Sequence, residues 1–232
     1  MTYRLRLDRR VRLFAVAAGL LALAGSISRP LAAQTAEKWD PAIAKFEAQD
    51  RVSPPPQNGI VFIGASSIVR WHLDEYFPEL GAAAINRGFG GSQSVDSVRY
   101  VDRIVVPYHP RTVVYYAGDN DVEAGVPASE IAHQFALFEE KVHAALPDTN
   151  VIFISIKPSI RRWKWIDTIR TANAIVKAYC LKTPHTQFVD IEQQMLGADG
   201  KPNAELLVPD GLHMTPAGYR IWTDALGPLL KQ

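Results

Sequence analysis

Five short apolar runs, separated by longer amphipathic stretches, constrain the fold of this 232-residue chain more than any other feature. The runs are nearly continuous in hydrophobic residues, as strands buried on both faces of a sheet are. They cover residues 60–63, 83–86, 112–116, 151–156 and 187–191. Helical periodicity occupies residues 67–77, 94–106, 128–146, 163–181 and 216–230. This alternation predicts βαβ units, and therefore an α/β fold whose parallel sheet carries helices on both faces.

The first 33 residues have the composition of a secretory signal peptide. Arginines within positions 4–12 precede an apolar stretch over 13–25, and small residues follow up to Ala33. The apolar stretch is shorter than the roughly 20 residues of a membrane-spanning helix. We therefore expect cleavage after Ala33 and export to the periplasm or the medium, with no stable membrane span afterwards. An uncleaved anchor is the alternative.

Residues 34–232 have the composition of a single globular domain without internal repeats. Asp40 and Pro41 predict the cap and first turn of a helix that ends near residue 50. The formal net charge of the whole chain is only +1, and the N-terminal arginines account for more than that. The remainder is therefore mildly acidic, which gives no electrostatic attraction for nucleic acid. Cys180 is the only cysteine, so no internal disulfide can form.

Four short polar motifs follow the first three predicted strands or precede the last predicted helix. They are Gly64-Ala65-Ser66-Ser67, Asn86-Arg87-Gly88-Phe89-Gly90-Gly91, Gly118-Asp119-Asn120-Asp121 and Asp210-Gly211-Leu212-His213. In open parallel sheets, sites form beyond the carboxyl ends of the strands, where the strand order reverses. In a flavodoxin-like order the first strand lies between the second and the third. The first three motifs would then meet at one place.

A hydroxyl nucleophile and three oxyanion donors are available in these motifs. Ser66 stands where a strand turns into a helix, so its hydroxyl can attack a carbonyl while its backbone N–H faces the oxyanion. Gly91 would add a backbone N–H, and Asn120 a neutral side-chain N–H₂. Each also has an ordinary structural interpretation: a helix cap for the serine, a tight turn for the other two. Ser67 is the alternative nucleophile.

The last motif supplies a general base and a carboxylate that can orient it. Asp210, three residues before His213, would accept the Nδ1–H and leave Nε2 to take the Ser66 proton. Asp119 and Asp121 raise the alternative of a metal site, but no His-x₃-His pair or ordered set of oxygen ligands accompanies them. Together the motifs predict ester hydrolysis through an acyl-enzyme, with no metal and no cofactor.

These residues resemble the SGNH hydrolases, also called GDSL-type esterases and lipases. The family's Ser, Gly, Asn and His blocks, and the Asp before its His, correspond to Ser66, Gly91, Asn120, His213 and Asp210. The block at 86–91 is similar to that of the platelet-activating-factor acetylhydrolase-like branch. The resemblance implies a three-layer α/β/α sandwich with a five-stranded parallel sheet, and metal-independent ester hydrolysis.

One position departs from the family's usual Gly-Asp-Ser, because Ala65 replaces the aspartate. This leaves a second function open, a non-catalytic carbohydrate- or lipid-binding module on the same fold. Trp163 and Trp165, after the fourth strand, are candidates for stacking on a sugar ring, and Arg161 for meeting a phosphate or carboxylate; packed tryptophans are the alternative. The lack of a long apolar lid favours short acyl groups on a small-molecule, carbohydrate or lipid ester.

Overall fold

The computed structural model describes the backbone of residues 31–231 and the side chains of residues 38–231. The predicted signal peptide, residues 1–33, lies outside the described residues except for its last three positions, which belong to the first helix. The helices are α1 (Leu31–Val52), α2 (Ser66–Val69), α3 (Leu73–Tyr76), α4 (Ser94–Ile104), α5 (Asp119–Glu123), α6 (Ala128–Ala145), α7 (Ile166–Cys180) and α8 (Pro216–Leu230). Short 3₁₀ turns cover Gly81–Ala83, Val106–Tyr108, Trp163–Trp165, Gln193–Met195 and Ala204–Leu206.

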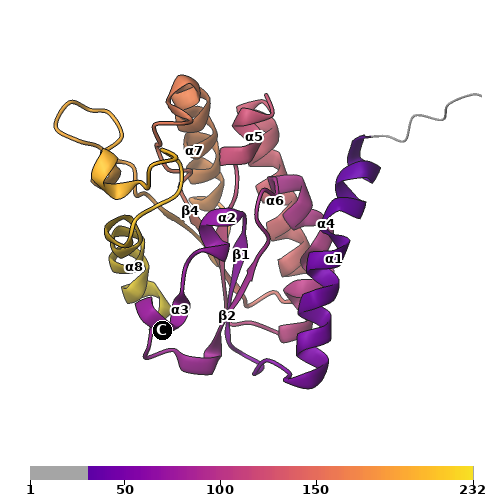
Figure 1. Ribbon diagram of the computed structural model, residues 1–232. Coiled ribbons are helices and arrows are strands. Elements are labelled where there is room, and N and C mark those ends of the chain that lie inside the picture. Colours follow the sequence, from indigo (N-terminus) through magenta and orange to yellow (C-terminus); the bar gives the residue numbers. More distant parts are fainter. Residues whose placement is uncertain (1–30, 232) are drawn as a thin grey trace, which may run out of the picture.

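A single parallel sheet of five strands forms the centre of the molecule (Figure 1). Its strands are β1 (Ile60–Gly64), β2 (Ala84–Gly88), β3 (Thr112–Tyr116), β4 (Asn150–Ile154) and β5 (Thr186–Val189). They are arranged in the order β2-β1-β3-β4-β5, and Ile60 is in register with Ala84 on one side and Thr112 on the other. The predicted fold class and strand order are therefore confirmed, and β1 lies between β2 and β3.

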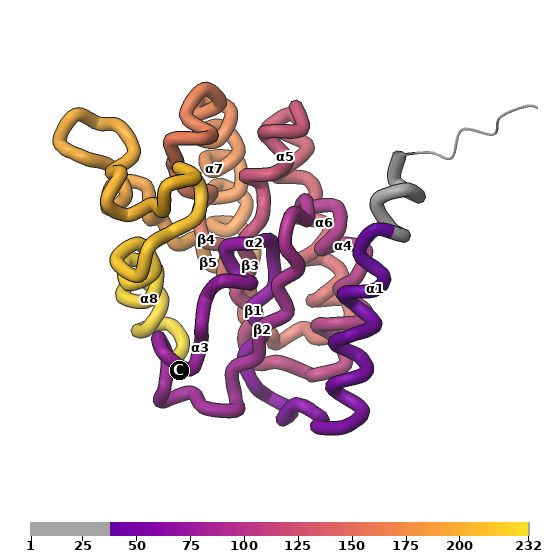
Figure 2. Tube along the Cα trace, viewed as in Figure 1, coloured from indigo at the N-terminus to yellow at the C-terminus, as the bar shows by residue number. Residues whose placement is uncertain are grey.

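Helices cover both faces of the sheet because successive strand residues point to opposite sides. In β1, Val61 and Ile63 pack into a core with α1, α4, α6 and α7, whereas Ile60 and Phe62 pack into a second core with α8. Figures 1 and 2 show α1, α4 and α6 on one side of the sheet and α3 and α8 on the other. Every side chain of β1 and of β3 is buried, which explains why these strands have near-continuous apolar sequences.

An aromatic cluster fills the second core beneath the loop that follows β1. Trp71 is 1% exposed, and its ring lies 5.4 Å from those of Phe62 and Trp222 and 5.9 Å from that of Tyr219. This packing explains a wrong prediction. The single helix expected over 67–77 is divided into α2 and α3, because α2 ends at Val69, with Arg70 as its C-cap, and the chain turns Trp71 into the core before α3 begins at Leu73.

Two other helix boundaries differ from expectation. The first helix does not begin at Asp40: α1 begins at Leu31 and Pro41 lies inside it. Proline is common in the first turn of a helix, but it also occurs at other helical positions. An Asp-Pro pair therefore does not by itself mark the start of a helix. The helix expected over 163–181 begins only at Ile166, after the 3₁₀ turn Trp163–Trp165. Residues 192–215, whose sequence has neither helical nor strand periodicity, contain two isolated antiparallel bridges, Leu196 to Pro202 and Leu207 to Met214.

Gly64, the last residue of β1, lies where the chain leaves the sheet and enters α2, and the backbone there has no room for a side chain. It has φ +149°, and a Cβ there would lie 1.9 Å from the carbonyl oxygen of Tyr116 on β3. We predict that Gly64→Ala lowers the free energy of unfolding by about 2–4 kcal/mol in urea titrations. Gly227→Ala is the matched control: it lies in α8 with nothing near its Cβ position, and should be neutral or gain up to about 1 kcal/mol. Equal midpoints for the two variants would contradict this account.

Candidate active site

Ser66, His213 and Asp210 form a continuous chain of hydrogen bonds at the carboxyl end of β1. His213 Nε2 lies 2.9 Å from Ser66 Oγ, and His213 Nδ1 lies 2.6 Å from Asp210 Oδ2. The serine and the histidine are 147 positions apart in the sequence, so only the tertiary fold brings them together. The arrangement allows the imidazole to take a proton from the hydroxyl while the carboxylate holds the ring by its other nitrogen.

A tight turn holds the histidine and its carboxylate in this orientation. Asp210 Oδ1 accepts the backbone N–H groups of Leu212 and His213, each at 2.9 Å, and Gly211 takes φ +66° between them. Thr215 then caps α8 by accepting the N–H of Gly218, as its position before Pro216 indicates. The last helix therefore anchors the loop that carries the base.

The environment of Asp210 keeps its carboxyl group ionised. Burial raises the pKa of Asp210, but the hydrogen bonds from the His213 ring and from two backbone N–H groups outweigh burial. The pKa consequently lies below its ordinary value. A carboxylate that stays ionised can stabilise the imidazolium that forms when the histidine takes a proton.

Three hydrogen-bond donors are available beside the serine for a negatively charged oxygen. Ser66 is the first residue of α2, so the helix does not use its backbone N–H. Gly91 is exposed in the loop after β2 with φ +84°. Asn120 lies in the first turn of α5 and donates one amide hydrogen to the carbonyl of Ser92, at 2.9 Å. An amide carries two such hydrogens, so the second remains for a ligand.

Hydrogen bonds between motifs fix these donors relative to one another. Phe89 donates its backbone N–H to the carbonyl of Gly64 at 2.9 Å, which joins the second motif to the first. Asp121 accepts both the backbone N–H and the hydroxyl of Ser94, which joins the third motif to α4. Burial raises the pKa of Asp121 to about 6, against the opposing effect of these hydrogen bonds.

Two buried basic side chains, Lys157 and Arg162, bind the first residue of α5, Asp119. Lys157, which is fully buried, donates to Asp119 Oδ2 at 3.0 Å and to the Tyr116 hydroxyl at 3.2 Å. Burial opposes ionisation of Asp119, but the Lys157 ammonium lowers the pKa of Asp119 below its ordinary value. Arg162, also buried, donates to the Asp119 carbonyl at 3.1 Å. Both aspartates of the motif thus have protein partners, and among the described residues no three His, Cys, Asp or Glu side chains are arranged to hold a metal.

The structure does not gather the predicted substrate-binding residues at the serine. Trp165 packs against the first core, with the Lys164 ammonium over its ring. Trp163 lies under the Arg170 guanidinium, 5.8 Å from it. Arg161 is exposed and donates its backbone N–H to the Gly211 carbonyl at 2.9 Å. Of the three, Arg161 alone lines a hollow that reaches the triad.

Two hollows contain residues of the candidate site. One of about 400 Å³ contains Gly91 and Asn120 and is otherwise lined by Lys38, Trp39, Gln93, Asp96, Glu123 and Ala124. The other, of about 480 Å³, contains Asp210 and is otherwise lined by Ile160, Arg161, Ala204, Leu207, Val208, Pro209 and Gly211. Trp39 carries no signal in the sequence, because it lies 52 positions before Gly91 in a segment that predicted only the start of a helix.

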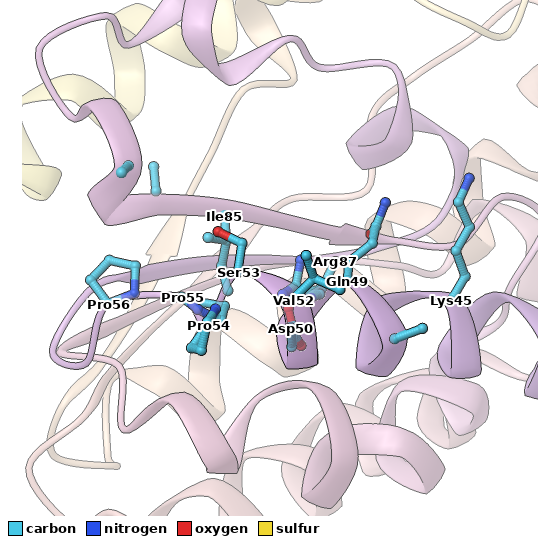
Figure 3. A pocket seen from close by; sticks show the side chains of 13 residues that line it. Lys45, Gln49, Asp50, Val52, Ser53, Pro54, Pro55, Pro56, Ile85 and Arg87 are labelled. Atoms are coloured by element: carbon cyan, nitrogen blue, oxygen red, sulfur yellow. Dashed lines mark hydrogen bonds and ion pairs between the residues drawn. The ribbon is translucent and has the colours of Figure 1, made fainter.

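A larger hollow, of about 730 Å³, lies between the C-terminal half of α1 and the edge strand β2 (Figure 3). It includes none of the triad residues or oxyanion donors. Arg87 on its wall is already paired with Asp50 and donates to the Tyr108 hydroxyl at 3.0 Å. The residues of the candidate site line the two smaller hollows and not this one.

The comparisons with known proteins agree with this geometry. The profile of the GDSL-like Lipase/Acylhydrolase family matches residues 64–221, which include all four motifs. No curated protein matches the chain. Within the part of the chain that the structure describes, none of the helices has the length and hydropathy needed to cross a membrane.

Three solved structures illustrate the likeness in fold. A Streptococcus pneumonia protein named after platelet activating factor has 23% identity and a TM-score of 0.73, covering 88% of this chain and 100% of its own. A GDSL-like lipase from Bacteroides thetaiotaomicron has 22% identity and a TM-score of 0.70, covering 82% and 97%. An acetyl-xylooligosaccharide esterase from Geobacillus Stearmophilus, solved as a mutant, has 18% identity and a TM-score of 0.62, covering 77% and 96%.

The pKa of Asp121 generates a prediction about stability against pH. Because the folded pKa of about 6 lies above the ordinary 3.8, the folded state binds this proton more tightly than the unfolded state does. The stabilisation of the folded state by protonated Asp121 is complete below about pH 4. It is lost as the pH rises towards 6, at up to about 1.4 kcal/mol per pH unit. We predict that the wild type loses stability relative to Asp121→Asn across this interval in urea titrations. A difference between the two proteins that stays constant from pH 4 to 6 would contradict the assignment.

Proposed function

This chain belongs to the GDSL-like lipase/acylhydrolase family and is a hydrolase of ester bonds, and on that premise we propose that it is a serine esterase that works through an acyl-enzyme on Ser66. The observation that carries the proposal is the continuous chain from Asp210 through His213 to the Ser66 hydroxyl. In this proposal the donors of Gly91 and Asn120 face the carbonyl that the Ser66 hydroxyl attacks.

The geometry supports the following sequence of steps. Ser66 Oγ attacks the acyl carbonyl while His213 Nε2 takes its proton, and Asp210 stabilises the imidazolium. The N–H groups of Ser66 and Gly91 and the amide of Asn120 donate to the tetrahedral oxyanion. The imidazolium returns the proton to the leaving alcohol as the ester C–O bond breaks. Water then attacks the acyl-enzyme with the same base, which releases the acid and restores the hydroxyl.

The proposed acyl group is short, and acetyl is the first choice. The polar lining of the hollow beside Gly91 and Asn120 disfavours a long alkyl chain on the part of the substrate that enters it, since such a chain would desolvate those charged groups without replacing their hydrogen bonds. The names of two proteins that share the fold, the acetyl-xylooligosaccharide esterase of Geobacillus and an acetyl esterase solved with an acetate ion, point the same way. The 86–91 block and the Streptococcus protein support placement near the platelet-activating-factor acetylhydrolase branch.

Two substitutions distinguish the role of the nucleophile from that of an oxyanion donor. On p-nitrophenyl acetate, Ser66→Ala should lower kcat by roughly 10⁴–10⁶-fold, because without the hydroxyl no acyl-enzyme forms. Asn120→Ala should lower kcat by roughly 10²–10³-fold with little change in KM, because its amide acts mainly in the transition state. Comparable activity of Ser66→Ala and the wild type would contradict the mechanism. A folded wild type without turnover at any acyl length would favour the binding module instead.

We further propose that the protein is exported and that residues 1–33 are removed. The basic segment, the short apolar stretch and the small residues up to Ala33 support this. Mass spectrometry of the protein recovered from the native secretory compartment should find Gln34 as its first residue. An intact N-terminus in the membrane fraction would show that the segment is an anchor.

A further inference from the structure

One wall of the hollow that contains Gly91 and Asn120 is formed by α1, a part of the chain distant in sequence. Trp39, from α1, brings the tip of its ring to 3.3 Å from the position that a Cβ on Gly91 would occupy. The hollow has a volume of about 400 Å³, within the roughly 300–1,000 Å³ typical of small-molecule sites. A molecule bound there would touch this ring and the donors of Gly91 and Asn120 together.

The indole of Trp39 is held in place before any ligand arrives. Its Nε1–H donates to Asp96 Oδ2 at 3.0 Å, and its ring meets that of Phe89 edge-on with centroids 5.8 Å apart. Asp96 is 2% exposed, and the same oxygen accepts the backbone N–H of Gln93 at 2.8 Å. Burial raises the pKa of Asp96 in spite of these hydrogen bonds. The chain thus buries a carboxyl group to fix one half-exposed ring at the edge of the site.

Charges of both signs surround this ring. The Lys38 ammonium lies 4.5 Å from the Trp39 centroid and forms no ion pair among the described residues. Glu123, on the opposite wall, is paired with Arg162. An anionic ligand would be repelled by the carboxylates and a cationic one by the lysine, whereas an alkyl chain would strip water from both. A neutral ligand with many hydroxyls can donate to carboxylate oxygens, accept from the ammonium and lay its C–H face on the ring.

We propose that the hollow formed by Trp39, Lys38, Gln93 and Glu123 beside Gly91 and Asn120 binds the sugar portion of an O-acylated carbohydrate. The inference rests on the proposed function and names the substrate class for it. Trp39 is the platform, and the exposed contact with Lys38, which is weak, gives way to the ligand. The recognition residues thus come from α1, from the N-cap residue of α4 and from α5, and not from the segment 161–165 that the sequence indicated.

The other hollow beside the triad serves as the comparison. Its walls are mostly apolar, with Ile160, Leu207 and Val208 among them, so it lacks the groups that bind hydroxyls. Were that hollow the main subsite, the protein would prefer esters with a larger apolar group or a lysophospholipid. Substrate preference therefore distinguishes the two hollows.

The kinetic test compares two tryptophans with the same substitution. For each protein, kcat/KM on acetylated xylo-oligosaccharides is divided by kcat/KM on p-nitrophenyl acetate, which has no sugar. Trp39→Ala should lower this ratio about tenfold or more, mainly through KM for the oligosaccharide, and Trp39→Phe should retain most of it. Trp163→Ala should leave the ratio within about twofold, because Trp163 lines neither hollow. An unchanged ratio in Trp39→Ala, an equal fall in Trp163→Ala, or a wild type that prefers a lysophospholipid would overturn the proposal.

A binding measurement separates this proposal from the esterase mechanism. Calorimetric titration of Ser66→Ala with the same oligosaccharides should show saturable binding that weakens at least tenfold when Trp39→Ala is added. Binding that does not depend on Trp39, or no binding at millimolar concentration, would overturn the sugar subsite even if the wild type hydrolyses p-nitrophenyl acetate. Binding that depends on Trp39 in a protein that hydrolyses no ester would uphold the subsite and overturn the esterase mechanism.

Discussion

The parallel pairing of β1 with β2 on one side and β3 on the other is the constraint on which the site depends. Parallel strands end at the same edge of a sheet, so the loops after these three strands meet there. The serine follows β1, the middle of these three strands, the glycine loop follows β2 and the asparagine helix follows β3. A different strand order would separate the nucleophile from the groups that surround it, whatever the loops contained.

Electrostatics imposes a second requirement on this edge. The short helix α5 carries Asn120 together with three carboxyl groups, Asp119, Asp121 and Glu123, next to the place where a negatively charged oxygen would form. Uncompensated carboxylates there would oppose that charge. The structure compensates each one: buried Lys157 pairs with Asp119, the N–H and hydroxyl of Ser94 bind Asp121, and buried Arg162 pairs with Glu123. The neutral amide between them remains available for a ligand.

The sequence predicted those parts of the molecule that depend on local pattern and on strand order. Buried parallel strands leave continuous apolar runs, and the motif that contains Asp210 and His213 is a local turn whose spacing alone allows the two side chains to meet. The break between α2 and α3 was not predictable, because it arises from tertiary packing of Trp71 on Phe62 and Trp222. Trp39 was missed for a similar reason, since its hydrogen bond to Asp96 spans 57 positions. The pairing of Lys157 with Asp119 likewise has no local signal.

The proposed mechanism requires that the hydroxyl of Ser66 takes the acyl group. The most direct test is to label the folded protein with a fluorophosphonate, which reacts with activated serines, and to locate the adduct by fragmentation mass spectrometry. We predict a single stoichiometric adduct on Ser66, lost when His213 is replaced by alanine. An adduct on Ser67, or equal labelling after Ser66 itself has been replaced, would contradict it.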